Sequence, residues 1–72
     1  MITHENVDTV FTYHAPTAEQ IPLYEQIRAA GKRLVLIILE VTPKCADQQA
    51  AIRKVREAVM TANAAIALNG EG

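Results

Sequence analysis

An aromatic loop and a basic helix face are the parts of this sequence whose residue types suit ligand binding. Phe11, Tyr13 and His14 precede Pro16 in an extended segment, because a proline disfavours helical backbone at the residue before it. Alternate side chains of such a segment face opposite sides, so Val10, Phe11 and Tyr13 cannot all point inward. Either the rings plug the end of a small core, or one of them stays on the surface, where it can stack on a nucleobase.

The basic face consists of Arg28, Lys32 and Arg33. Arg28 and Lys32 are one helical turn apart, so their side chains are neighbours. Two or three cations are enough to bind a small phosphate-bearing ligand through charge-assisted hydrogen bonds. The same trio also fits an ordinary solvent-exposed helix face, and only the nearby Tyr13 loop favours the phosphate interpretation.

The distribution of charge narrows the class of ligand. The net charge of the 72 residues is −1, yet residues 1–27 carry four acidic residues and no Lys or Arg. All seven basic residues fall in 28–56, beside only Glu40 and Asp47. Long nucleic acid requires a broad basic face and is therefore not an expected partner. A small anion remains a candidate.

The residues needed for catalysis or for a metal site do not form a recognisable set. His4, His14 and Cys45 are too few and too scattered to bind a metal ion. The sequence has no Gly-rich phosphate loop, no Ser-His-Asp set and no carboxylate pair that falls in one cleft. We therefore expect a protein that is not an enzyme and has no metal or cofactor.

The cysteine content and the hydropathy of the chain indicate its cellular compartment. Cys45 is the only cysteine, which excludes an internal disulfide and favours a reducing compartment. The apolar run 34–39 is far shorter than the roughly 20 residues that span a membrane. The polar, acidic start of the chain does not resemble a signal peptide. We expect a cytoplasmic protein with no membrane partner.

Two helical segments must position these residues. Residues 45–69 place apolar side chains at alternating steps of three and four, which is typical of a helix packed against another helix. These seam positions are Ile52, Val55, Val59, Ala62 and Ile66, with Ala51, Ala58 and Ala65 beside them. Residues 17–42 begin with the capping box Thr17–Gln20 and continue with a second seam. That seam comprises Tyr24, Ile27, Gly31, Leu34, Ile38 and Val41.

The predicted fold is all-α. A short turn between two helices of similar length makes them antiparallel, so we expect one helical hairpin domain over 1–72, with residues 1–16 as a short helical turn and the aromatic loop. The run 33–41 would also suit a buried strand, but no hairpin partner for a strand exists. A helix that is apolar on all sides needs covering on all sides, which predicts a compact homo-oligomer. Gly31 is either tolerated or allows close approach of a helix or ligand, and Asn63 is either exposed or pairs across a symmetric interface.

Two longer motifs carry a family resemblance. The segments FTYHAP (11–16) and EAVMTANAAIA (57–67), with YEQIRAAGKRL between them, resemble the anti-CBASS type 2 nucleotide sponges of phages. Their shared unit is a helical hairpin domain that also occurs in a second anti-defence sponge. The resemblance covers residues from about 6 to 68.

The resemblance implies an immune-evasion function. Members of that family bind cyclic oligonucleotide messengers of bacterial CBASS immunity, such as cyclic GMP-AMP, in the host cytoplasm and do not cleave them. They form homo-hexamers that hold cyclic dinucleotides between subunits and cyclic trinucleotides in other pockets. Tyr13 matches the family's aromatic position, with Phe11 and His14 in the same loop, and Arg28 and Lys32 are candidate phosphate contacts.

The turn between the helices departs from the family pattern. A Ser is common at Cys45, and arginines are common at Ala46 and Gln48, so ligand contacts from those arginines would be absent here. Two other functions compete with the sponge. A structural or partner-binding hairpin would need the seams but no aromatic–basic pair, and a phosphodiesterase would need metal ligands that the sequence does not supply.

Overall fold

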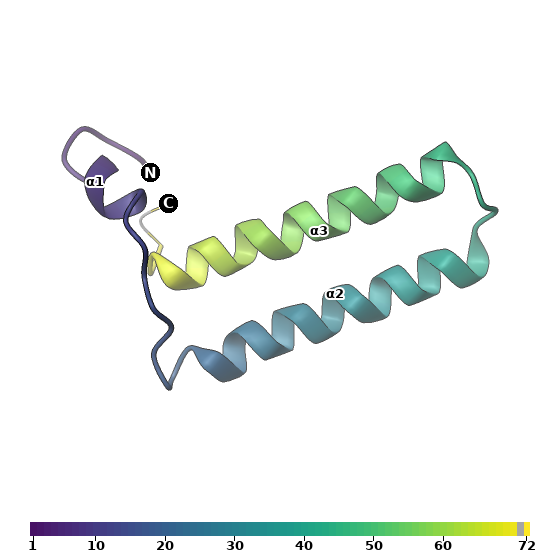
Figure 1. The fold of residues 1–72 in the computed structure, drawn as a ribbon, viewed down its shortest axis with the longest axis horizontal. Helices are drawn as coiled ribbons and strands as arrows, with labels where there is room; N and C mark the ends of the chain where they lie inside the picture. Colours follow the sequence, from purple (N-terminus) through teal and green to yellow (C-terminus); the bar gives the residue numbers. More distant parts are fainter. Residues whose placement is uncertain (71) are drawn as a thin grey trace.

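The computed structural model describes residues 1–70 and 72, and its body is a pair of long antiparallel helices (Figure 1). The helices are α1 (Val7–Val10), α2 (Ile21–Val41) and α3 (Ala46–Ala67). The described residues include no strand, so the run 33–41 is helical and the predicted all-α hairpin is confirmed. Neither long helix contains a stretch in its described residues that is apolar enough to cross a lipid bilayer.

The start of α2 is fixed by the predicted capping box. The Thr17 backbone N–H donates to Gln20 Oε1 at 3.0 Å, and the Gln20 backbone N–H donates to Thr17 Oγ1 at 3.2 Å. Regular helix begins at Ile21, and Pro22 lies in the first turn, where a missing N–H does least harm. Gln20 Nε2 also donates to the Ile66 carbonyl at 3.1 Å, which joins the start of α2 to the end of α3.

The helix α3 ends at Ala67, and the chain turns away at the following Asn69–Gly70 pair. Asn69 has a φ of 49° and Gly70 a φ of 86°. The Gly70 N–H donates to the Ala65 carbonyl at 3.1 Å, and the Asn69 N–H donates to the Ile66 carbonyl at 3.2 Å. This bonding pattern is the Schellman motif, which satisfies the last carbonyls of a helix.

Gln48 stabilises the turn between α2 and α3. The family pattern often has arginine at this position. Gln48 is 6% exposed and is the only buried residue among those the structure describes. Its Nε2 donates to the Thr42 carbonyl at 3.2 Å, just past the end of α2. The residue at this position therefore supports the turn from inside the hairpin.

The predicted packing seam is correct on α3 and partly wrong on α2. All five predicted seam residues of α3 are half-buried. On α2 the half-buried set is Tyr24, Ile27, Gly31, Val35 and Ile38, and Thr42 just past its end is also half-buried. Leu34 is 48% exposed and Val41 72% exposed. The run 33–41 is apolar on every side, so its sequence does not define which residues face α3.

Much of the apolar surface of α2 faces outward in the single chain. Within residues 1–70 and 72, no hydrophobic side chain is fully buried. Six large apolar residues of α2 besides Val41 are between 45% and 49% exposed: Ile21, Leu23, Leu34, Leu36, Ile37 and Leu39. An exposed apolar face of this kind marks an interaction surface. The predicted homo-oligomer would cover it.

At Gly31, α2 packs so closely against α3 that the space leaves no room for a side chain. A Cβ built on Gly31 would lie 2.6 Å from Val59 Cγ2 of α3. Valine in a helix has one strongly preferred side-chain rotamer, so Val59 cannot easily turn away. Of the two interpretations from sequence, the structure supports close approach by a helix.

Gly31→Ala is therefore expected to lower the free energy of unfolding by about 1 kcal/mol. Over-packing of a tight contact destabilises by about 1–3 kcal/mol, and the gain in helix propensity offsets about 1 kcal/mol of that. A denaturant titration measures the change. In a Val59→Ala background the clash is removed, because the next atoms are 3.8 Å or more away, and the same Gly31→Ala change should then stabilise. Stabilisation by the single Gly31→Ala change would contradict the close-approach argument.

Candidate functional site

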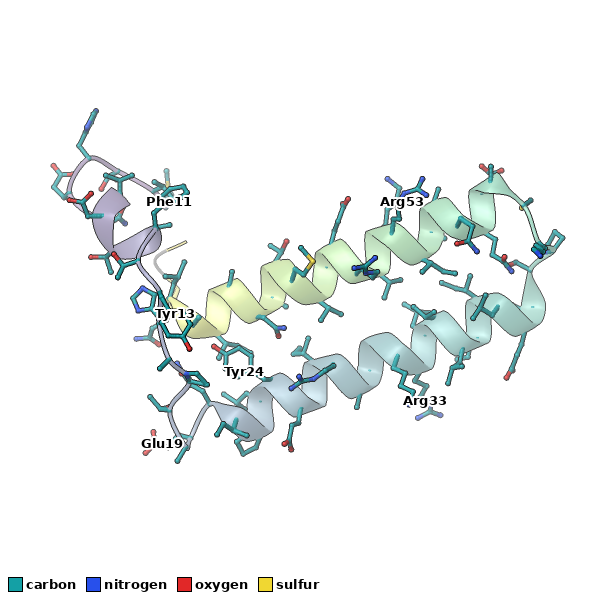
Figure 2. The ribbon with its side chains drawn as sticks, in the orientation of Figure 1. Phe11, Tyr13, Glu19, Tyr24, Arg33 and Arg53 are labelled. Carbon is teal, nitrogen blue, oxygen red and sulfur yellow. The ribbon has the colours of Figure 1, made fainter. Side chains whose placement is uncertain are left out.

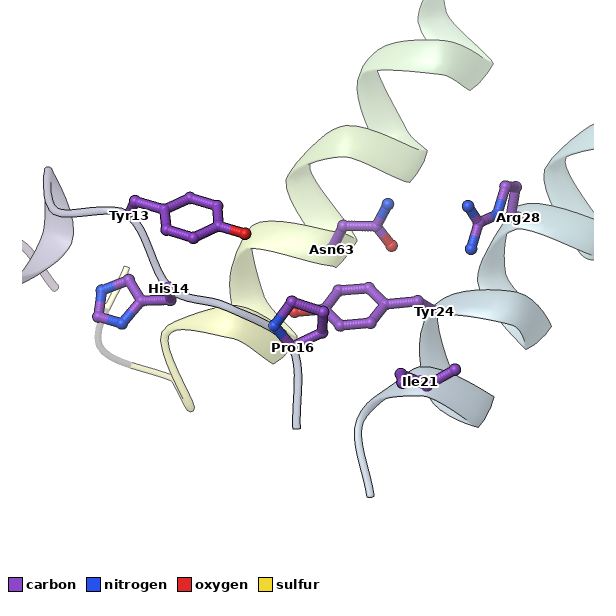
Figure 3. Close-up of a pocket in the computed structure, with 7 residues that line it drawn as sticks. All are labelled: Tyr13, His14, Pro16, Ile21, Tyr24, Arg28 and Asn63. Atoms are coloured by element: carbon purple, nitrogen blue, oxygen red, sulfur yellow. The ribbon is translucent and has the colours of Figure 1, made fainter. Parts of the chain in front are cut away.

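A pocket of about 320 Å³ lies at the open end of the hairpin, where the aromatic loop meets the two long helices (Figure 3). The loop contributes Tyr13, His14 and Pro16. The first turns of α2 contribute Ile21, Tyr24 and Arg28, and α3 contributes Asn63. The structure thus brings together residues from three separate parts of the chain.

Hydrogen bonds join the aromatic loop to α1. His14 Nε2 lies 2.7 Å from the Thr9 carbonyl oxygen and donates to it, so Nε2 carries the proton in the neutral ring. Thr12 Oγ1 donates to the Asp8 carbonyl in the same region. These bonds give the segment after α1 a defined path, which sets the position of Tyr13.

Tyr13 presents a free ring to the pocket. It is 84% exposed, and its hydroxyl points toward Asn63 in Figure 3. An exposed ring held by an ordered loop is suited to stacking on a flat ligand at little entropic cost. Phe11 is also on the surface, 79% exposed, but it lies beside α1 and does not line this pocket (Figure 2). The interpretation of these rings as plugs of the hairpin core is therefore wrong for the single chain.

The two candidate cations take different positions. Arg28 lies one turn after Tyr24 and directs its guanidinium across the pocket toward Asn63 (Figure 3). Lys32 is one turn further along α2 and does not line the pocket. Arg28 and Lys32 together border an adjoining groove of about 420 Å³, where Arg56 adds a third cation. The basic face therefore begins in the pocket and continues along the hairpin.

Sequence reasoning did not identify Tyr24 and Asn63 as members of the site. Tyr24 was assigned to the helix seam, and it is half-buried, but its ring also lines the pocket. Asn63 is half-buried, and its Oδ1 has no hydrogen-bond partner among the described residues. An isolated amide in an alanine-rich helix was the one sequence signal that pointed to Asn63.

The side chains that line the pocket are suited to binding a ligand. Two tyrosine rings offer stacking surfaces, one guanidinium offers paired donors for a phosphate, and one amide offers a donor and an acceptor. Among the described residues, no three His, Cys, Asp or Glu side chains gather where they would bind a metal ion. The set suits a ligand that carries both an aromatic base and a negative charge.

Comparison with known proteins agrees with this description. No curated protein and no solved structure is similar enough to the chain to count as a match. A family model described as "Acb2/Tad1, hairpin domain" matches residues 3–67, which include the aromatic loop, both long helices and every residue of the pocket. The chain therefore belongs to the Acb2/Tad1 hairpin-domain family, whose general role is that of a sponge for cyclic oligonucleotides rather than an enzyme.

Proposed function

We propose that this chain binds cyclic dinucleotides such as cyclic GMP-AMP and sequesters them uncleaved, so that a CBASS effector in the host cytoplasm is not activated. The observation that carries the proposal is the convergence of Tyr13, Tyr24 and Arg28 on one pocket. A cyclic dinucleotide presents flat bases and charged phosphates together, and this pocket offers a partner for each. The sponge role of the family supports the same ligand class.

Each residue has a distinct part in the proposed complex. The Tyr13 ring stacks on a base, with Tyr24 bordering the same space. Arg28 donates to a phosphate oxygen, and Lys32, one turn along α2, adds charge on the side where the second phosphate would lie. His14 holds the loop through its bond to Thr9. Phe11 lies outside the pocket of one chain and would meet a ligand only through another subunit.

A second copy of the chain completes the site in this proposal. Ligand pockets usually measure about 300–1,000 Å³, and the pocket of one chain, about 320 Å³, is at the lower end. One subunit therefore encloses part of a cyclic dinucleotide. The exposed apolar face of α2 would bring further subunits together, and we propose a homo-hexamer as the assembly.

Cyclic trinucleotides are a weaker expectation for this chain. The family pattern often has arginine at positions 46 and 48, where this chain has Ala46 and Gln48. Gln48 is buried and its amide is already bonded to Thr42. The turn therefore offers no cation at either position, and we propose that dinucleotides are the main ligands.

Isothermal titration against a panel of cyclic di- and trinucleotides tests the function. We expect a dissociation constant well below the micromolar range for at least one cyclic dinucleotide, since a stoichiometric sponge must bind below the concentration of its messenger. The complex is then heated and the released ligand identified by mass spectrometry. Intact ligand is the expected result.

Two other results would replace the proposal. Recovery of linear or hydrolysed nucleotide would show a phosphodiesterase. Absence of binding to every member of the panel would leave an oligomeric hairpin with a structural or partner-binding role. An oligomer that remains intact in that case would exclude misfolding as the reason.

A further inference from the structure

The side-chain carbonyl of Asn63 lacks a partner in the described chain. Its Oδ1 is enclosed by the surrounding residues and accepts no hydrogen bond. A buried carbonyl without a donor destabilises a protein, and native structures contain few of them. A donor outside the single chain, on a ligand, a water molecule or a second copy, can satisfy such a group.

The place of Asn63 in the pocket indicates what that donor is. In Figure 3 the Tyr13 hydroxyl and the Arg28 guanidinium approach Asn63 from opposite sides, and the Tyr24 ring lies below it. Base stacking is assigned to Tyr13 and phosphate binding to Arg28 in the proposed function. We place the edge of the stacked base against Asn63, because the Tyr13 ring that holds the base points toward this amide.

An amide is well suited to that edge. It offers an acceptor and two donors in one plane, and asparagine pairs with the adjacent donor and acceptor of a purine in this way. The terminal torsion of asparagine is broad, so the amide can turn toward the pocket while α3 stays in place.

We propose that Asn63 recognises the edge of the base: its Oδ1 accepts a hydrogen bond from an N–H on the edge of the base that stacks on Tyr13. This inference rests on the proposed function, because it requires a nucleotide in the pocket. It goes further by naming the group that bonds to the edge of the base. In adenine the 6-amino group carries every N–H of the base, so that group is the donor when adenine is bound.

The variant that isolates this contact is Asn63→Leu, which keeps the size of the side chain and removes its polar atoms. Its affinity for cyclic GMP-AMP, cyclic di-AMP and cyclic di-GMP should fall about tenfold or more for each one that the wild type binds. Its melting temperature without ligand should be unchanged or higher, because the unpaired carbonyl is gone. Thr61→Val, an exposed position on α3 outside the pocket, is the matched control and should bind like the wild type.

A change in the ligand tests the same contact from the other side. An analogue of cyclic di-AMP with both 6-amino groups replaced by hydrogen should bind the wild type about tenfold more weakly than cyclic di-AMP itself. Asn63→Leu should bind the two equally. The loss of discrimination, rather than the loss of affinity alone, identifies Asn63 as the group that recognises the base.

The outcomes separate this inference from the function beneath it. If the wild type binds no cyclic dinucleotide, the proposed function and the inference both fail. If the wild type binds and Asn63→Leu binds equally tightly, the function stands and the inference is overturned. A lower melting temperature or a changed oligomeric state in Asn63→Leu would instead assign the amide to the fold or to pairing across a symmetric interface, and would also overturn it.

Discussion

Replacing Arg28 and Lys32 together with alanine is expected to weaken binding of a cyclic dinucleotide by about 100-fold, or about 2.7 kcal/mol. Arg28 directs its guanidinium into the pocket, and Lys32 follows one turn along the same face of α2. Both donate charge-assisted hydrogen bonds in the proposed complex, and these bonds are stronger than neutral ones. Titration calorimetry at physiological salt measures the loss.

The electrostatic origin of this effect is tested by salt and by a matched variant. Both side chains are exposed, so added salt should weaken wild-type binding and have less effect on the double variant. Arg53→Ala/Lys54→Ala removes the same charge from α3 without touching the pocket, and its affinity should change little. Equal losses in the two double variants would show that net charge, and not the Arg28–Lys32 pair, determines binding.

The ends of the helices could be predicted because local chemistry determines them. The Thr17–Gln20 capping box forms both of its expected bonds. Asn69–Gly70, a residue pair typical of helix C-termini, adopts the positive φ values that follow α3. Each signal involves residues close in sequence, so it needs no knowledge of how the helices pack.

The helix interface was less predictable where the sequence is uniformly apolar. On α3, large apolar residues recur at steps of three and four and are separated by polar or small residues, so the seam was predicted correctly. On α2, Val35 faces the partner helix while Leu34 remains 48% exposed. Both are large and apolar, so only the position of α3 distinguishes them. The contact of Gly31 with Val59 is of the same kind, since it depends on the crossing of two helices.

The candidate site, like the helix interface, could be predicted from the sequence only in part. Tyr13, His14 and Arg28 converge on one pocket, while Lys32 borders the adjoining groove and Phe11 lies outside both. Which face of a loop meets a helix depends on long-range contacts, such as the bond from Gln20 to Ile66. Tyr24 and Asn63 lie 39 residues apart in the sequence, and only the antiparallel pairing of α2 and α3 brings them together.

Tyr13→Ala is expected to weaken dinucleotide binding by about 10- to 100-fold, because stacking of a base on an aromatic ring contributes about 1–3 kcal/mol. The ring is 84% exposed and contributes little to the core, so the melting temperature and the oligomeric state should not change. Calorimetry gives the affinity, and size-exclusion chromatography with light scattering gives the assembly.

Two related variants identify the ring itself as the cause. Tyr13→Phe keeps the stacking surface and should retain most of the affinity, since the hydroxyl has no assigned bond to the ligand. Phe11→Ala removes the other exposed ring of the loop, which does not line the pocket, and should have a smaller effect than Tyr13→Ala. If Tyr13→Ala bound as tightly as the wild type, stacking at this loop would be excluded, and the hairpin would be better explained as a structural oligomer that does not use its aromatic loop for a nucleotide.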